Sequence, residues 1–326
     1  MTGLYDSYNR CIDYLRISVT DRCNLRCIYC TAYSIANLTH DDILRYEEIE
    51  RIVRVAAFAG IKKIRLTGGE PLLRLDLDKL VAMIYRIDGI DDISLTTNGI
   101  LLGQYALRLK EAGLDRVNIS LDTLQKERFQ VISGRDHLDE VLAGIEAAHR
   151  AGLEPVKINM VVIRGMNDDE VLDFARKSKD EGWHVRFIEY MPFATPGLET
   201  LGAVPKQEIW EKLQSLGKLE PCYDQTGNGP AVYYRLPGTK GTIGFITPVT
   251  EHFCQSCNRL RLTSDGQLRP CLLDDGEIDL KGPLRNGAGD EELTGLIMKA
   301  VSLKPEQHKL ARGLTPNGRT MCQIGG

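Results

Sequence analysis

Short apolar, β-branched runs alternate with amphipathic stretches through the first two-thirds of the chain. The apolar runs predict strands at Tyr14–Val19, Lys63–Leu66, Ile93–Thr97, Arg116–Leu121, Pro155–Ile163 and His184–Tyr190. The amphipathic stretches predict helices at Tyr46–Ala59, Leu75–Ile87, Leu101–Ala112, Leu138–Ala151 and Asp168–Glu181. Regular alternation of strands and helices indicates a parallel sheet with right-handed crossovers.

About six strand–helix units are too few for a closed eight-unit barrel. We therefore expect an α/β fold with a partial, TIM-like (β/α)6 barrel over residues 1–192. The reactive groups should lie at the C-terminal ends of its strands.

The pattern becomes irregular from residue 193, where prolines and the turn-rich run at 227–230 appear. Strands are predicted at Ala231–Leu236, Thr242–Thr247 and Asn258–Thr263, and a helix at Asp290–Val301. Residues 193–326 are therefore expected to form a second, irregular C-terminal region.

Charge and hydropathy exclude some classes of protein. Forty-five acidic and 41 basic residues give a formal net charge of −4, which excludes a generally basic nucleic-acid-binding protein. No apolar stretch approaches the roughly 18 residues needed to cross a bilayer. The first residues lack the basic start and apolar run of a secretory signal, so a cytoplasmic enzyme is expected.

Nine cysteines change this picture. An odd number without a secretion signal argues against a disulfide framework. Six of them form two triplets, namely Cys23, Cys27, Cys30 and Cys254, Cys257, Cys271. Clustered thiols in a reducing compartment indicate metal binding.

The first triplet follows the first predicted strand, in the pattern C-x-x-x-C-x-aromatic-C with Tyr29 as the aromatic residue. Three thiolates can hold three irons of a [4Fe–4S] cluster and leave the fourth iron open to another ligand. The alternatives are a zinc site with a distant fourth ligand and a redox pair, Cys27 and Cys30. The complete pattern after a first β/α strand favours the cluster.

Polar residues recur on the same face of the predicted barrel. In the run 67–71, Gly68 and Gly69 would let the backbone approach a ligand, and Glu70 could accept a hydrogen bond from an ammonium group. The alternative for this run is an ordinary turn. Other polar groups on or after successive strands are Thr96, Ser120, Asp122, Lys157, Asn159, Arg186 and Glu189. Their recurrence indicates a polar ligand in the barrel.

The second triplet fits a zinc site and an iron–sulfur cluster equally by its spacing. A zinc site would need a fourth ligand, for which His252, Cys222 or Cys322 could serve. Arg259 and Arg261 alternate on a predicted strand and therefore face the same side. Two guanidinium groups beside a metal site indicate an anion pocket, with phosphate as the first candidate. The alternative is a pair of surface salt bridges.

Taken together, the motifs resemble the GTP 3′,8-cyclase family, which belongs to the radical S-adenosylmethionine (SAM) superfamily and acts in molybdenum cofactor biosynthesis. The resemblance covers nearly the whole chain. The matching segments are Tyr14–Asn24 with the first cysteine triplet, Arg65–Pro71, Leu95–Gly99, Val117–Asp122, Arg186–Glu189, Phe253–Arg261 and the terminal Gly325-Gly326.

The resemblance implies two [4Fe–4S] clusters, SAM as cofactor and GTP as substrate. The amino and carboxylate groups of SAM would fill the open iron site, and one electron would split SAM to a 5′-deoxyadenosyl radical. That radical would take the ribose 3′ hydrogen of GTP, and the C3′ radical would attack C8 of guanine. Reduction would then give 3′,8-cyclo-7,8-dihydro-GTP, the first step of molybdopterin biosynthesis.

The resemblance also implies residue roles. The two cysteine triplets would hold the clusters, and the C-terminal cluster would bind the guanine edge. Arg16 would contact GTP and assist the late reduction, and Gly325 and Gly326 would take part in catalysis. The expected SAM contacts are Tyr29, Gly68, Gly69, Glu70, Ser120 and Met191. The expected GTP contacts are Arg16, Arg65, Thr96, Lys157, Arg259, Leu260 and Arg261.

The expected partners are a one-electron donor such as flavodoxin or ferredoxin, a downstream cyclic pyranopterin monophosphate synthase, and a second copy of the chain in a homodimer. Neither nucleic acid nor a membrane is expected. Residues 31–37 depart from the family, which usually continues here with Met-Pro and a longer glycine-bearing segment. Since this loop would border the SAM site, we expect its altered sequence to change the affinity for the cofactor.

Two points have alternatives. The polar C-terminal tail could be disordered, but its two glycines, its terminal carboxylate and Ile324 predict that it enters the active-site cavity. The whole chain could instead be a radical SAM peptide-modifying enzyme, but that class typically has more cysteines in its C-terminal region and an N-terminal peptide-recognition module, and neither is expected from this sequence. A zinc-stabilised β/α binding protein is the non-enzymatic alternative.

Overall fold

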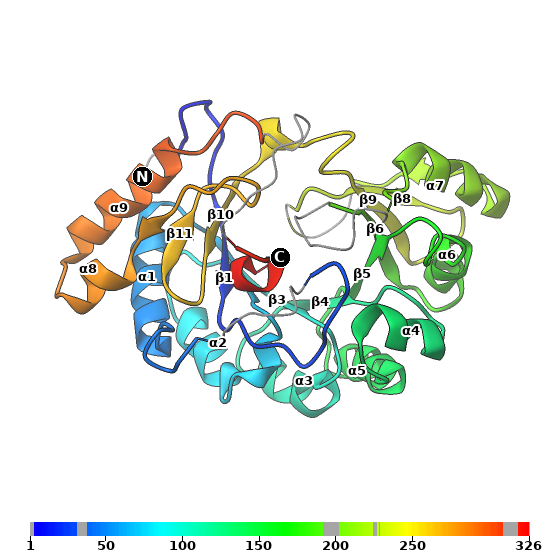
Figure 1. Cartoon of the computed structure of the whole chain (residues 1–326), viewed down its shortest axis with the longest axis horizontal. Coiled ribbons are helices and arrows are strands. Elements are labelled where there is room, and N and C mark those ends of the chain that lie inside the picture. The colour runs from blue at the N-terminus through cyan, green and yellow to red at the C-terminus, as the bar shows by residue number, and fades with distance from the viewer. Residues whose placement is uncertain are drawn as a thin grey trace.

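The structure is a computed structural model, and it describes residues 3–30, 38–191, 202–223, 227, 229–308 and 319–325. Six parallel strands form its centre in chain order, as the sequence predicted. They are β1 (Tyr14–Ser18), β2 (Lys63–Thr67), β3 (Asp92–Thr97), β4 (Arg116–Ser120), β5 (Lys157–Val162) and β6 (His184–Glu189). The predicted partial (β/α)6 barrel is confirmed, with its strands curving around an open centre (Figure 1).

Helices cover the outer face of this sheet (Figure 1). Between the central strands lie α1 (Tyr46–Ala59), a short 3₁₀ turn η1 (Pro71–Leu73), α2 (Leu77–Tyr85), α3 (Leu102–Glu111), α4 (Lys126–Ser133), α5 (Leu138–Arg150) and α6 (Val171–Asp180). Helix α4 was not predicted, because only three of its eight residues are buried and its apolar periodicity is correspondingly weak.

The C-terminal region extends the same sheet at both edges. Strand β10 (Arg259–Leu262) pairs in parallel with β1, and β9 (Thr242–Ile246) pairs in parallel with β6. The outer strands are antiparallel, namely β11 (Gln267–Arg269) and β12 (Ile278–Asp279) beyond β10, and β8 (Val232–Arg235) and β7 (Glu220–Pro221) beyond β9. Within the described part of the chain, the sheet thus has twelve strands in one open order, from β12 to β7.

The remaining helices surround these added strands. They are α7 (Lys206–Leu213), η2 (Gln214–Leu216), η3 (Cys254–Ser256), α8 (Lys281–Arg285), α9 (Asp290–Ser302) and α10 (Met321–Ile324). Helix α9 packs on α1, whereas α10 lies inside the open barrel (Figure 1). The predicted division at residue 192 falls at the start of residues 192–201, which lie outside the described residues, so this boundary stays a prediction.

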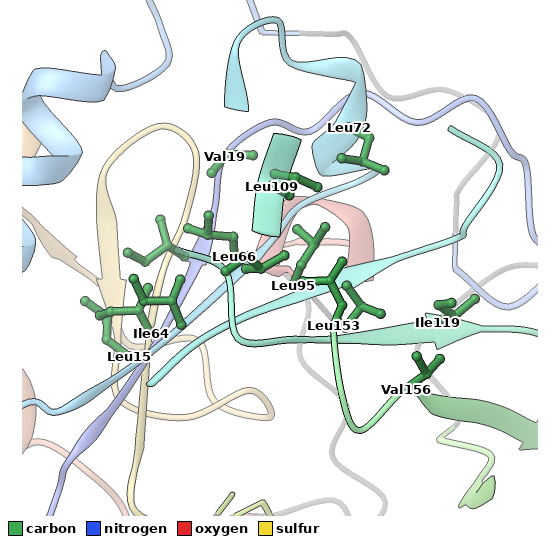
Figure 2. Close-up of a cluster of buried hydrophobic side chains, with 14 of the residues drawn as sticks. Leu15, Val19, Ile64, Leu66, Leu72, Leu95, Leu109, Ile119, Leu153 and Val156 are labelled. Atoms are coloured by element: carbon green, nitrogen blue, oxygen red, sulfur yellow. The ribbon is translucent and has the colours of Figure 1, made fainter. Parts of the chain in front are cut away.

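Alternation along each central strand separates a core face from a cavity face. Leu15, Ile64, Leu66 and Leu95 belong to one buried hydrophobic cluster with residues of the covering helices (Figure 2). The residues between them point to the barrel interior, where the sequence has polar side chains. Within the described residues, no helix is long and apolar enough to cross a membrane.

Candidate active site

One cavity opens at the C-terminal ends of the central strands and holds about 290 Å³ of space. Both cysteine triplets line it, together with residues of β1 to β6 and Met321 of α10. The predicted site residues that also line it are Arg16, Tyr29, Arg65, Gly68, Gly69, Thr96, Ser120, Met191, Arg259 and Arg261. Segments more than 200 residues apart in sequence therefore meet at one site.

The loop after β1 carries the first triplet and is held against α4. The amide of Arg26 donates to the carbonyl of Ser133 at 2.8 Å, and that of Ile28 donates to Ile132 at 3.0 Å. Burial raises the pKa of Cys23 to about 11 and raises that of Cys27 well above its usual value. On binding a metal centre these thiols would release their protons to solvent, because the metal cation takes the place of the proton on sulfur.

The two glycines of the run 67–71 line the cavity and are also required by a close approach between two loops. A Cβ on Gly68 would lie 2.5 Å from the carbonyl oxygen of Thr20, and one on Gly69 would collide with the carbonyl oxygen of Arg22. The amide of Gly69 donates to Thr20 at 2.8 Å. The glycines thus allow the backbone of this run to approach the β1 loop as well as the cavity.

Glu70 is turned away from the cavity. It is 1% exposed, and its carboxylate accepts hydrogen bonds from the Thr97 hydroxyl at 2.7 Å and the Asn98 amide at 2.7 Å. The amide of Leu72 is a third donor, at 3.1 Å. Glu70 therefore ties the loop after β2 to the loop after β3, and its expected contact with SAM stays a prediction.

Tyr29 and Asp122 link the first triplet to the opposite side of the barrel. The Tyr29 hydroxyl donates to Oδ2 of Asp122 at 2.6 Å, and Oδ1 of Asp122 accepts from the Val161 amide at 2.8 Å. Burial raises the pKa of Asp122 to about 6. The pair holds the Tyr29 ring at the cavity wall beside Cys30.

Three arginines lie in register across adjacent strands. Arg261 of β10 is paired with Arg16 of β1, and Arg16 is paired with Arg65 of β2. Burial, together with the neighbouring Arg261, lowers the pKa of Arg16 well below its usual value. Burial, with Arg259 as the next cause, lowers the pKa of Arg261 to about 10. Such mutual repulsion is relieved by an anion, so this layer is suited to a phosphorylated ligand.

Unused polar atoms in the cavity wall also indicate a polar ligand. Thr96 Oγ1 and Asn159 Oδ1 are shielded from solvent and have no hydrogen-bond partner among the described residues. Unpartnered buried polar atoms are costly, so a ligand that satisfies them would gain binding free energy.

Two expected GTP contacts are placed differently from the rest. Lys157 is 3% exposed and lies deeper in the barrel, where burial, followed by Arg186, lowers its pKa to about 6. Leu260 alternates with Arg259 and Arg261, so its side chain is 1% exposed in the hydrophobic core on the opposite face of β10. A side-chain contact from Leu260 to a ligand in the cavity is therefore not supported.

The second triplet lies on η3 and at the end of β11, across the cavity from the first. Burial raises the pKa of Cys257, but Arg259 and Lys304 outweigh this effect and lower it to about 6. Two of the suggested zinc ligands are elsewhere, since Cys222 lines a separate hollow beside β7 and Cys322 lies next to Cys30. Among the described residues, no group of three His, Cys, Asp or Glu side chains is arranged to hold a single metal ion.

The end of the chain enters the cavity. The carbonyl oxygen of Gly325 accepts from Nη1 of Arg261 at 2.8 Å, and Ile324 is 1% exposed. Helix α10 begins with a capping box in which Thr320 and Gln323 bond to each other's backbone amides. Gly326 and residues 31–37 lie outside the described residues, so the expectations for them stay predictions, as does the catalytic role of Gly325.

Three residues near the cavity had no signal in the sequence, namely Arg10, Lys304 and His308. Lys304 and His308 line the wall beside the second triplet, and Arg10 lies behind Cys254. Each is a single basic residue outside any motif, so only the contacts made by the folded chain identify it.

Comparison with known proteins identifies the family of the chain. Residues 17–177 match the Radical SAM superfamily, and residues 183–310 match the family described as Molybdenum Cofactor Synthesis C. A GTP 3′,8-cyclase of Moorella thermoacetica is 54% identical and covers 99% of this chain and 100% of its own length. One from Pelotomaculum thermopropionicum is 53% identical, with 99% and 100% covered.

Solved structures show the same fold at low identity. Streptococcus suis SuiB bound to S-adenosylmethionine is 16% identical, with a TM-score of 0.61 over 89% of this chain and 69% of its own. The protein anSMEcpe with bound AdoMet is 18% identical, with a TM-score of 0.58 over 93% of this chain and 82% of its own. Given the full-length relatives, this chain belongs to the GTP 3′,8-cyclase family of the radical SAM superfamily.

Proposed function

We propose that this chain is a GTP 3′,8-cyclase, which converts GTP to 3′,8-cyclo-7,8-dihydro-GTP in the first step of molybdopterin biosynthesis. One observation carries the proposal beyond family membership. Two three-cysteine sites face a single cavity, and the arginine layer of Arg261, Arg16 and Arg65 lines the same cavity. This arrangement can hold a radical-generating cofactor, a triphosphate and a purine base together.

The cysteine loops fit iron–sulfur clusters. The amide of Leu25 donates to Cys23 Sγ at 3.4 Å, and the amide of Leu273 donates to Cys271 Sγ at 3.4 Å. Amide donors to sulfur stabilise thiolates and tune cluster potentials. We assign Cys23, Cys27 and Cys30 to one [4Fe–4S] cluster and Cys254, Cys257 and Cys271 to a second. When bound, the first cluster and SAM supply a 5′-deoxyadenosyl radical that can remove the ribose 3′ hydrogen.

The residues around the first triplet bind and orient SAM. Tyr29, Gly69, Ser120 and Met191 surround the space next to Cys30, and Asp122 fixes the Tyr29 ring. Gly68 and Glu70 hold the loops that shape this space. Our proposal places the SAM methionine and ribose against these groups.

The residues between the two triplets bind GTP. Arg16, Arg65, Arg259 and Arg261 neutralise the triphosphate, and Lys157 adds a deeper positive charge when the bound phosphate raises its lowered pKa. Thr96 Oγ1 can complete its hydrogen bonding with GTP. The guanine then lies toward the second triplet, which places its C8 and the ribose 3′ carbon in the centre of the cavity.

Arg16 and the tail act after the first hydrogen transfer. Arg16 lies beside Arg261, and Arg261 holds the Gly325 carbonyl. Docking of the tail therefore fixes Arg261 and, through it, the space left for the Arg16 guanidinium. We assign to Arg16 the role of assisting the final reduction, with Gly325 and Gly326 as the groups that arrange it.

Further partners follow from the chemistry. The reaction needs a one-electron donor such as flavodoxin or ferredoxin, and its product is the substrate of a cyclic pyranopterin monophosphate synthase. A homodimer and a cytoplasmic location complete the proposal.

The test is anaerobic incubation of the reconstituted protein with SAM, dithionite and GTP, followed by mass analysis of the nucleotide. We expect 3′,8-cyclo-7,8-dihydro-GTP and 5′-deoxyadenosine, with no cyclised product when ATP replaces GTP. Metal analysis should give about eight irons and eight sulfides per chain, with broad absorbance around 400 nm. About two zinc ions without that absorbance would support the zinc-stabilised binding protein instead.

A further inference from the structure

A buried ammonium group connects the two loops of the second cysteine triplet. Lys304 follows α9 and is 3% exposed. Its Nζ donates to the carbonyl oxygen of Arg259 at 2.8 Å and to that of Pro270 at 2.7 Å. Arg259 is two residues after Cys257, and Pro270 immediately precedes Cys271. One side chain thus sets the separation of two cysteine-bearing segments.

The remaining cysteine of this triplet, Cys254, is held by Arg10. Its Nη1 donates to the carbonyl oxygen of Cys254 at 2.7 Å and to that of Glu306 at 3.0 Å. Its Nη2 donates to the carbonyl oxygen of Pro305 at 2.7 Å. Because Pro305 and Glu306 directly follow Lys304, the two cations and all three cysteines form one connected unit (Figure 1 shows the N-terminal segment near the segment after α9).

The two cations differ in how their charge is balanced. Asp6 accepts from Nε of Arg10 at 2.5 Å, and this ion pair is buried. Lys304 donates instead to two neutral carbonyl oxygens, those of Arg259 and Pro270. A buried charge without a carboxylate partner is costly, unless another anionic group lies nearby. The thiolates of a cluster held by Cys257 and Cys271 would be that group.

We propose that Lys304 is a positioning residue for the second [4Fe–4S] cluster. It holds the Cys257 and Cys271 segments at the separation that the cluster needs, and its charge favours the anionic thiolates. The proposal rests on the assignment of a cluster to Cys254, Cys257 and Cys271. Because reduction adds negative charge to a cluster, the ammonium group also favours the reduced state and raises the midpoint potential. Arg10, neutralised by Asp6, contributes to loop position alone.

The test uses the full chain with Cys23, Cys27 and Cys30 replaced by Ala, so that only the second cluster is assembled. Lys304→Met, Lys304→Arg and Arg10→Met are made in this parent, with Lys299→Met as the matched control, because Lys299 is exposed on the adjacent helix α9. Two quantities are measured, namely the rate of iron release to a chelator and the midpoint potential from electron paramagnetic resonance titration.

Lys304→Met should release iron about tenfold faster or more and should have a more negative midpoint potential. Lys304→Arg, which keeps the charge and can donate to both carbonyls, should recover most of both losses. Arg10→Met should speed iron release with little change in potential, and Lys299→Met should match the parent.

Three results would overturn the reasoning. If the parent binds no iron at the second triplet, the cluster assignment in the proposed function is wrong. If Lys304→Met retains iron and potential as the parent does, Lys304 has no positioning role. If Lys304→Met and Lys304→Arg lose iron equally, the charge is irrelevant. Should Lys304→Met fail to fold by circular dichroism, Lys304→Gln, which keeps a hydrogen-bond donor but removes the charge, is compared with Lys304→Arg in both measurements, and equal iron release and equal potential in these two variants would overturn the role of the charge.

Discussion

Replacement of Gly325 by Ala should undock the C-terminal tail. Gly325 has a φ of +70°, and a Cβ there would lie 2.6 Å from Thr67 Cγ2 and 3.3 Å from Ser18 Cβ. The left-handed backbone costs an alanine about 1–2 kcal/mol, and overpacking in a rigid site costs about 1–3 kcal/mol more. The sum of about 2–5 kcal/mol corresponds to roughly a 30-fold to several-thousand-fold loss of docked tail.

The assay separates two products. If tail docking arranges Arg261 and Arg16 for the late chemistry, Gly325→Ala should lower the yield of cyclised nucleotide by about tenfold or more. Iron content and SAM cleavage to 5′-deoxyadenosine should persist, because Gly325 makes no described hydrogen bond to the cysteine loops. Gly103→Ala is the matched control, since a Cβ at Gly103 meets no atom within 4 Å.

A compensating substitution makes the test specific. Thr67→Ser keeps the hydroxyl but removes Cγ2, which is the closest atom to the new Cβ. In the double variant the steric part of the cost should be relieved while the backbone strain remains, so product yield should recover in part. Normal yield in Gly325→Ala, or no recovery in the double variant, would refute the reasoning.

Three further predictions concern the rest of the site. Ala at Cys23, Cys27 or Cys30 should abolish reductive SAM cleavage, whereas Ala at Cys254, Cys257 or Cys271 should leave uncoupled cleavage and stop cyclisation; equal loss of cleavage in both sets would contradict the assignment. Arg261→Ala removes a charge-assisted contact of about 1.5–3 kcal/mol and should weaken GTP binding about tenfold or more with iron content unchanged, as measured by calorimetry. Lys157, with a pKa of about 6, is mostly neutral at pH 7.5, and phosphate binding should raise that pKa. GTP binding should therefore take up a proton and weaken as pH rises above about 6, and proton uptake measured in two buffers of different ionisation enthalpy should disappear in Lys157→Met.

The local pattern of apolar and polar residues was sufficient to predict the barrel. Helix α1 spans the predicted residues Tyr46–Ala59, and each central strand lies within three residues of its predicted bounds. Alternation of apolar and polar residues determines which face of a strand is buried, and that rule acts over neighbouring residues only. The same rule predicted that Arg259 and Arg261 face one side, and it also explains why Leu260 faces the core.

The sequence predicted only part of the candidate site. Cysteine spacing identified both triplets, since ligands of one cluster lie on short loops. The sequence did not show that Gly68, Gly69 and Glu70 also join neighbouring loops, because the groups they contact, such as the Thr20 and Arg22 carbonyls and the Asn98 amide, belong to segments distant in the chain. Addition of β9 and β10 to opposite edges of the barrel sheet was also not predictable from the irregular C-terminal pattern.

The sequence by itself therefore determined the β/α barrel, the cysteine sites and the family resemblance, all of which depend on residues close together in the chain. Only the tertiary structure decided which distant groups meet. Arg10 contacts Cys254 and Glu306 across separations of 244 and 296 residues, and Arg261 contacts Gly325 across 64. In the sequence, an isolated lysine or arginine looks the same whether it lies on the surface or beside a metal site. The difference arises when folding removes it from water and gives it particular carbonyl partners.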